Sequence, residues 1–203
     1  SASASPFLSA VQMEGPLRRG KVSFLGSIRR SLVGRTAPIL IGEDLPFSFN
    51  DAFLKLHASG EDRYRCGVTA IRTTDEGRTS RDNGEGDATF RWTNLSVGGQ
   101  CLALPSESKT RLDVNAGVSY IGNRFREAGD AQRRSSSLQF NTELNLTSNV
   151  SPAAEVRWGI FTRMNWINYN LREFLGVQVS KETLFNTGAY VEGPYQLGEG
   201  LRV

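Results

Sequence analysis

Apolar and polar residues alternate along much of the chain, most clearly over residues 111–120, 138–146 and 155–160. A period of two places successive side chains on opposite faces of a β-strand, whereas a helix would scatter them around its circumference. No long stretch has the 3.6-residue period of an amphipathic helix. Each stretch is therefore predicted to be a strand with one face in an apolar medium and the other in a polar medium. The residues expected on the apolar side are Leu112, Val114, Val118, Tyr120, Leu138, Phe140, Leu144, Val156, Trp158 and Ile160.

Weaker alternation predicts further strands, which brings the total to about nine or ten. Most are long enough to cross a bilayer at a tilt, which takes about 9–11 residues. The additional segments are roughly 8–14, 21–30, 47–57, 63–73, 88–101 and 184–192.

The expected connections alternate strictly between short and long. The short ones are Glu14–Gly20, Ala58–Asp62, Pro105–Lys109, Ser148–Pro152 and Gly193–Gly198. The long ones are Ser31–Pro46, Thr74–Asp87, Gly122–Ser135 and Asn168–Thr183. Outer-membrane barrels have short periplasmic turns and longer outer loops. The pattern predicts an all-β fold: an antiparallel up-and-down meander that forms an open segment of a large transmembrane β-barrel. In that setting the apolar residues above would face lipid.

Composition narrows the function classes. The chain has 203 residues and a net charge of +3, with no Lys/Arg block, so no nucleic-acid partner is expected. No apolar run approaches the ~18 residues of a membrane helix, and the two cysteines match no zinc pattern. The start lacks a signal peptide, and Gly200–Val203 reads as the beginning of a strand. We therefore expect residues 1–203 to be one partial barrel domain, cut from a longer protein and without a plug domain.

Several motifs occur in an order that resembles one family. Glu14–Leu17, Gly20–Phe24 and Arg29–Ser31 resemble an early barrel hairpin of TonB-dependent receptors, of the type with a carboxypeptidase-like amino-terminal domain. Further matches are Asp44–Phe47 leading into Asp51–Leu56, Trp92 in the next hairpin, and Phe185–Glu192 with Gly200–Arg202. The match lies in the order of these motifs over nearly the whole chain.

The resemblance implies a segment of a barrel of about 22 strands in the bacterial outer membrane. The function implied is active import of an iron chelate, a vitamin, an oligosaccharide or a peptide. The implied partners are outer-membrane lipid, lipopolysaccharide, and the TonB complex acting through the plug. No catalytic residue, metal or cofactor is implied, so an enzyme is not expected. The alternatives are a complete small barrel with a structural or adhesive role, and a soluble β-sandwich that binds carbohydrate.

Few side chains suggest chemistry. His57 is the only histidine and lacks a matching nucleophile motif, so a polar strand end is the preferred interpretation. Glu143 and Glu155 are expected to face the lumen rather than to form an acid–base pair. Trp158 is expected to point outward, whereas Trp166 and Tyr169 fit an aromatic belt or a ligand contact equally well.

Arginines concentrate in the expected long loops, at Arg78, Arg81, Arg124, Arg126, Arg133 and Arg134. Three roles are compatible with them: plain solvation, binding of an anionic ligand, and bridging of lipopolysaccharide phosphates.

Cys66 and Cys101 are nearly equidistant from Asn83 and Gly84, the expected tip of their hairpin. They should therefore lie almost opposite each other, and a disulfide is possible because the periplasm is oxidising. A register slip of one residue would send them to opposite faces.

Overall fold

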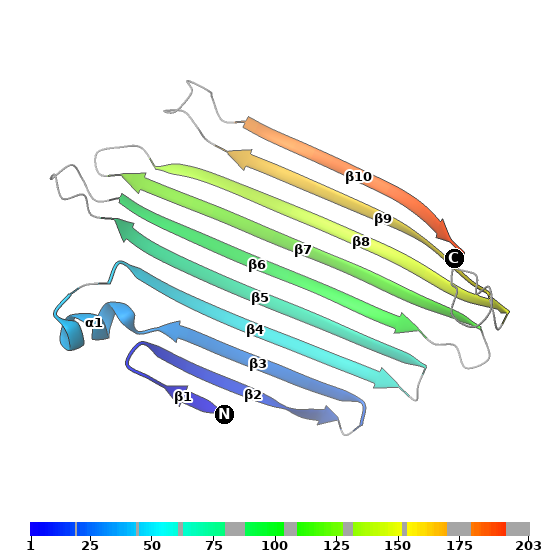
Figure 1. Cartoon of the computed structure of the whole chain (residues 1–203), viewed down its shortest axis with the longest axis horizontal. Helices are drawn as coiled ribbons and strands as arrows, with labels where there is room; N and C mark the ends of the chain where they lie inside the picture. The colour runs from blue at the N-terminus through cyan, green and yellow to red at the C-terminus, as the bar shows by residue number, and fades with distance from the viewer. Residues whose placement is uncertain are drawn as a thin grey trace, which may run out of the picture.

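A single antiparallel sheet of ten strands forms almost the whole of the computed structural model of the chain (Figure 1). The structure describes residues 1–18, 20–43, 45–60, 63–79, 88–103, 109–127, 132–151, 154–169 and 180–193. The strands are β1 (Ala2–Ala4), β2 (Leu8–Arg18), β3 (Val22–Ser31), β4 (Phe47–Gly60), β5 (Tyr64–Thr79), β6 (Ala88–Ala103), β7 (Thr110–Glu127), β8 (Arg133–Ser151), β9 (Ala154–Tyr169) and β10 (Ser180–Glu192).

Each strand pairs with its neighbours in sequence, so the spatial order is the chain order from β1 to β10. Among the described strands, β1 and β10 form the two edges of the sheet and do not pair with each other. The prediction of an open, all-β antiparallel meander is confirmed. Because there is one sheet, the sandwich alternative, which needs two packed sheets, is wrong.

The strands extend further than the sequence indicated. β5 continues to Thr79, β7 continues to Glu127 and β8 begins at Arg133, whereas we expected long loops over 74–87 and 122–135. The connection between β7 and β8 (128–132) was expected to be long, but it is no longer than the connection between β6 and β7 (104–109), which was expected to be short. The predicted strict alternation of short and long connections is therefore wrong at the β7–β8 hairpin. Apart from Phe125, these strand ends carry polar residues and glycine on both faces, so they lack the clear alternation that marks a strand in the sequence.

Two elements were missed entirely. The first is β1, three residues near the start of the chain, where the sequence analysis predicted no strand. The second is the helix α1 (Val33–Ile41), which lies inside the expected loop between β3 and β4. Pro38 lies within this helix, although proline disfavours the interior of a helix. Gly42 ends the helix with φ of 73°, the left-handed conformation that glycine adopts without strain.

The two ends of the sheet differ. At the loop end, α1 joins β3 to β4, and residues 80–87, 128–132 and 170–179 join the next three strand pairs. At the turn end, the connections are mostly short, as between Arg18 and Val22 or Gly60 and Tyr64. The loop end is the end of the sheet where α1 lies in Figure 1.

The sheet has almost no core of its own. The buried apolar residues are Val33, Ala37 and Ala88, and no large side chain among the described residues is fully buried. A protein in water normally buries its large apolar side chains. The described sheet therefore leaves most of its large apolar side chains without a core in which to pack.

Candidate functional site: the two faces of the sheet

Strand register divides the side chains into two sets, because directly opposed residues on antiparallel strands share a face. Leu112 on β7 is opposite Leu146 on β8, which is opposite Trp158 on β9. We call the side that carries these residues the apolar face, and the other side the polar face.

The ten residues predicted to share an apolar side all lie on the apolar face. Val114 aligns with Leu144 and Ile160, and Val118 aligns with Phe140. Many of these side chains are exposed: Trp158 is 40% and Ile160 is 51% accessible. The face continues across the other strands through Val11, Met13, Phe24, Ile28, Leu54, Leu56, Val68, Leu95, Val97, Phe185 and Val191. An apolar surface of this extent is rare on a monomer in water and is typical of a surface that contacts another protein or a membrane.

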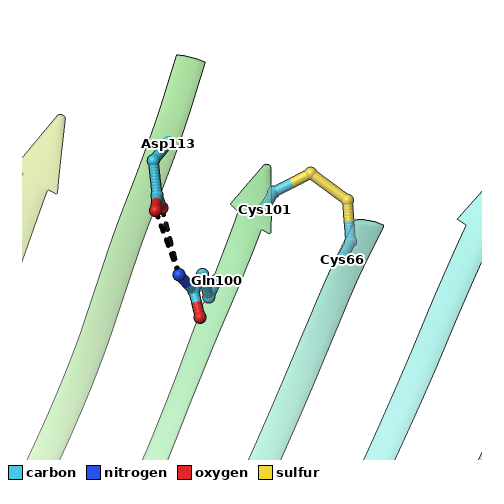
Figure 2. Close-up of a disulfide and its surroundings, with 4 residues drawn as sticks. All are labelled: Cys66, Gln100, Cys101 and Asp113. Atoms are coloured by element: carbon cyan, nitrogen blue, oxygen red, sulfur yellow. Dashed lines mark hydrogen bonds between the residues drawn. A yellow bond between two sulfur atoms is a disulfide. The ribbon is translucent and has the colours of Figure 1, made fainter. Parts of the chain in front are cut away.

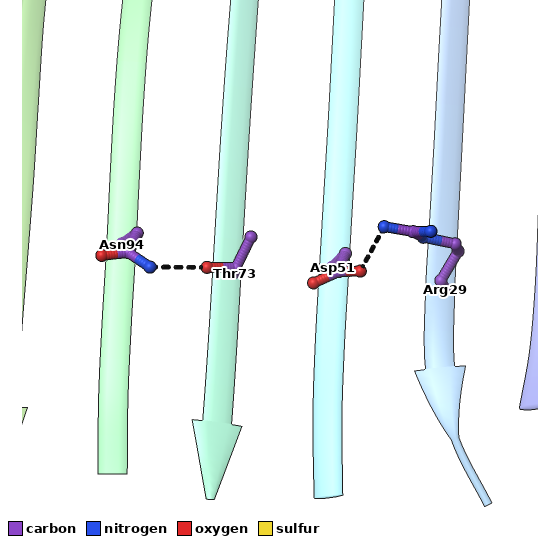
Figure 3. Close-up of polar contacts among 4 residues, drawn as sticks. All are labelled: Arg29, Asp51, Thr73 and Asn94. Carbon is purple, nitrogen blue, oxygen red and sulfur yellow. Dashed lines mark hydrogen bonds and ion pairs between the residues drawn. The ribbon is translucent and has the colours of Figure 1, made fainter.

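The polar face is held together by side-chain hydrogen bonds between neighbouring strands. The Asn94 amide donates to the Thr73 hydroxyl at 2.9 Å, and Arg29 donates to Asp51 at 2.7 Å (Figure 3). The hydroxyl groups of Ser96 and Ser119 share a hydrogen bond of 2.7 Å. These polar groups thus form hydrogen bonds with one another along the polar face.

Glu143 and Glu155 both lie on the polar face, but the structure does not bring them together. Glu143 is opposite Phe161 on β9, six positions along the strand from Glu155, or about 20 Å at ~3.3 Å per residue. Each has a partner two residues away: Asn145 donates to Glu143 at 2.9 Å, and Arg157 pairs with Glu155. The pair is therefore too far apart to act as a joint acid and base.

His57 lies near the turn end of the polar face, beside a shallow hollow of about 590 Å³. Lys55 and Arg65 line the same hollow. Its floor is low because Gly98 and Gly117 are aligned across β6 and β7. The hollow lies on the polar face and is lined by residues from several strands, so the sequence pattern alone could not predict it.

The tryptophans divide between the two faces. Trp158 and Trp166 are both on the apolar face of β9 and are exposed. Tyr169 is on the polar face, where its hydroxyl donates to Glu182 at 3.0 Å, so Trp166 and Tyr169 do not form one site. Trp92 also lies on the polar face, with its ring centroid 4.8 Å from that of Phe90.

Charged residues are distributed unequally between the faces. Within the described strands every carboxylate except Glu76 lies on the polar face: Glu14, Asp51, Asp75, Asp113, Glu127, Glu143, Glu155, Glu182 and Glu192. The apolar face instead carries a row of cations at the loop end, which we call the cationic border: Arg30, Arg72, Arg78, Arg91, Arg124, Arg126, Arg134 and Lys181.

The cationic border corrects the sequence interpretation of the arginines. Arg78, Arg124, Arg126 and Arg134 were expected in loops, but they are strand residues that point to the apolar side. Arg133 is also a strand residue, on the polar face, and its guanidinium lies 5.6 Å from the Phe125 ring centroid. Arg81 lies outside the described residues. Arg30, Arg72 and Arg91 were missed, although extending the two-residue period to the strand ends would have found them.

Cys66 and Cys101 lie on the apolar face and form a disulfide (Figure 2). Gln100, the next residue, points to the other side and donates to Asp113 at 3.1 Å. Asn83 and Gly84, the expected hairpin tip, lie outside the described residues, as do Gly200–Val203.

Within the part of the chain that the structure describes, no three side chains of the metal-binding types His, Cys, Asp and Glu come together. No described helix has the length and apolar character needed to cross a membrane.

No protein-family model matches the chain, and no curated protein sequence matches it. Several solved structures match the chain, and two of them are described here as examples. The outer membrane transporter YddB from Escherichia coli aligns over 93% of this chain and 31% of its own, with 10% identity and a TM-score of 0.63. The ferric-catecholate import receptor Fiu from E. coli K12 aligns over 95% of this chain and 44% of its own, with 12% identity and a TM-score of 0.51. The chain thus has the fold of a stretch of these outer-membrane proteins and spans a third to under half of their length.

Proposed function

We propose that this chain is part of the wall of a transmembrane β-barrel in the bacterial outer membrane, in a receptor of the TonB-dependent type. The apolar face meets lipid, and the polar face lines the interior. The observation that carries this proposal is an open ten-stranded sheet with an extensive apolar face and almost no core. In lipid only helices and closed barrels satisfy every backbone group, so the edges β1 and β10 require further strands to close the wall.

Aromatic residues on the apolar face support a membrane position. Trp158 and Trp166 lie eight positions apart on β9, about 26 Å of strand at ~3.3 Å per residue. With a tilt of about 40°, this gives roughly 20 Å across the membrane, and the rings would extend toward the edges of an apolar band about 25 Å tall. Such interfacial aromatic girdles flank the lipid-facing band of outer-membrane barrels.

The whole protein would act in active uptake across the outer membrane. Its substrate would be an iron chelate, a vitamin, an oligosaccharide or a peptide, and its plug domain would couple it to the TonB complex. We propose no enzymatic role, and residues 1–203 would contribute one partial barrel domain. The fold shared with YddB and Fiu supports this proposal. The side-chain hydrogen bonds on the polar face link neighbouring strands and do not assemble a group of catalytic side chains.

The experiment that tests the orientation is a spin-label scan along residues 111–120 of the protein in bilayers. Labels at 112, 114, 116, 118 and 120 should be accessible to oxygen, which concentrates in lipid, and protected from a water-soluble nickel complex. Labels at the intervening positions serve as the matched control and should show less oxygen access. Equal access at both sets, or the inverse pattern, would overturn the proposed orientation.

A further inference from the structure

The disulfide between Cys66 and Cys101 lies on the face that the proposed function turns toward lipid. Cys66 is opposite Ala58 on β4. Cys101 is opposite Val114 on β7, one of the residues expected from the alternation to face lipid. Along β5, the next residue of the apolar face is Val68, which is 48% exposed. The residues around the bond are therefore apolar, and neither cysteine has a charged residue directly opposite it.

Water meets the other side of the same hairpin, because the interior of an outer-membrane barrel is polar. Gln100 points to that side and away from the disulfide, as Figure 2 shows. Tyr64 lies on the apolar face, two residues nearer the turn end than Cys66, at a position that suits an interfacial aromatic side chain. In the inserted protein, the sheet thus separates the sulfur atoms from the lumen, and the interfacial layer separates them from the periplasm.

Formation of the bond is an oxidation and needs an acceptor for two electrons. The thiolate of one cysteine attacks a sulfur atom of an acceptor disulfide, which forms a mixed disulfide and releases the first acceptor thiolate. The thiolate of the second cysteine then attacks the sulfur atom of the first, which closes the Cys66–Cys101 bond and releases the second acceptor thiolate. The two protons of the cysteine thiols pass through water to the acceptor, which leaves as a dithiol.

Lipid opposes this exchange in two ways. The thiolate is the nucleophile, and a charged group is costly in a medium without water. The acceptor is a soluble disulfide of the oxidising periplasm, and it does not enter the hydrocarbon layer. Exchange at Cys66 and Cys101 should therefore be fast in the periplasm and slow after insertion.

We infer that the Cys66–Cys101 bond closes in the periplasm before β5 and β6 enter the membrane. The β5–β6 hairpin is then inserted as a covalently closed unit with its register already fixed. β5 and β6 are consecutive in the chain, and the cysteines are 35 residues apart, so closure needs no other part of the sheet. This inference rests on the proposed function, since it needs the apolar face to be in lipid.

The first test compares oxidation rates before and after insertion. The full-length protein is reduced in urea and inserted into vesicles without oxidant, and the probe is oxidised glutathione. The readout is the loss of thiols that react with a maleimide after denaturation, with Cys66→Ser/Cys101→Ser as the blank for any other cysteine. The inserted protein should be oxidised at least about tenfold more slowly than the same protein in urea.

The matched control carries its cysteine pair on the polar face. The hydroxyl groups of Ser96 and Ser119 are 2.7 Å apart there, so Ser96→Cys/Ser119→Cys in the blank background places two thiols in contact. This pair should be oxidised in the inserted protein at least as fast as in urea. Equal rates for the two pairs after insertion, fast or slow, would overturn the inference, because lipid would not be what protects the native cysteines.

A second control covers the case in which the first control variant does not insert. Thr73 and Asn94 are directly opposed on the polar face of β5 and β6, and their side chains are 2.9 Å apart (Figure 3). Thr73→Cys/Asn94→Cys in the same blank background therefore tests the opposite face of the very hairpin that carries the disulfide. Its expected rate and its contradicting outcome are those of the first control.

The order of events is measured in cells by pulse labelling. Samples are quenched in acid at successive times, and free thiols are modified with a maleimide of high mass that slows migration in a gel. Insertion is followed in parallel by resistance to urea extraction. The thiols of Cys66 and Cys101 should disappear before this resistance appears.

Failure of this inference and failure of the proposed function give different results. If both thiols are still reactive in protein that already resists urea extraction and disappear later, the inferred order is wrong and the barrel is unaffected. If urea extracts the unmodified protein from the membrane at every time, the proposed membrane function is wrong.

Discussion

Cys66 on β5 and Cys101 on β6 are directly opposed, with their Cα atoms 4.0 Å apart and their sulfur atoms bonded. The bond can form only in this register, because a shift of one residue would place the two side chains on opposite faces. The disulfide thus fixes the β5–β6 hairpin in the register that puts Val68 and Val97 on the apolar face.

The first prediction concerns the state of these cysteines. Thiol labelling of the denatured, unreduced protein should find no reactive thiol, and labelling after reduction should find two per chain. Two thiols before reduction would rule the bond out. A bond that closes a sequence separation of 35 residues should stabilise the fold by about 3–4 kcal/mol. The Cys66→Ser/Cys101→Ser variant should therefore unfold at lower urea, with reduced unmodified protein as the control.

A second prediction compares the two faces at neighbouring positions of β8. Phe140 is on the apolar face and Gln139 is on the polar face. Phe140→Arg should destabilise the inserted protein by up to about 2–4 kcal/mol, because it places a charge in lipid. Gln139→Arg should change stability little, since that face is polar. Unfolding by urea in vesicles measures both, and equal costs would contradict the assignment of the faces.

The Arg29–Asp51 ion pair on the polar face should contribute little to stability. The Arg29 side chain is 57% exposed, so solvent screens the 2.7 Å contact. A double-mutant cycle with Arg29→Met and Asp51→Asn should give a coupling energy of about 0.2–1 kcal/mol. A much larger coupling would mean that the polar face is shielded from water, as it would be if a tightly packed domain fills the interior.

Gly159 permits a contact that spans three strands. It lies between Tyr190 on β10 and Asn145 on β8, and the Tyr190 hydroxyl donates to Asn145 Oδ1 at 2.7 Å across it. A Cβ at Gly159 would sit 2.6 Å from Tyr190 Cε1 and 2.9 Å from the Leu144 carbonyl oxygen.

Gly159→Ala should therefore destabilise the sheet by about 1–3 kcal/mol through overpacking. Tyr190→Phe keeps the ring and removes only the hydrogen bond, so it should cost about 0.5–1.5 kcal/mol. Equilibrium unfolding in urea measures both variants. A Gly159→Ala cost no greater than that of Tyr190→Phe would show that the ring moves aside freely.

The sequence determined the centres of the strands from β2 to β10 and the division of their side chains between two faces. Alternation is a property of the local sequence. Once a segment is extended, the period of two determines on which face of the sheet each side chain lies. Leu112, Phe140 and Trp158 could for this reason be assigned to one face from the sequence, and the opposed cysteines followed from counting along one hairpin. The order of the strands also followed, because short connections favour antiparallel neighbours.

Only the tertiary structure decided where the strands end and on which face the side chains at those ends lie. Arg78 and Arg124 lie in strand ends that are mostly polar, so alternation gives little signal there, and only pairing with the next strand reveals that they are extended. An apolar groove of about 440 Å³ beside Arg72 depends on Gly26, Ala52 and Ala70, three small residues that are far apart in the sequence and adjacent across the sheet. The helix α1 likewise forms despite Pro38, with Val33 and Ala37 buried. These features arise from contacts between segments, which a one-dimensional pattern does not contain.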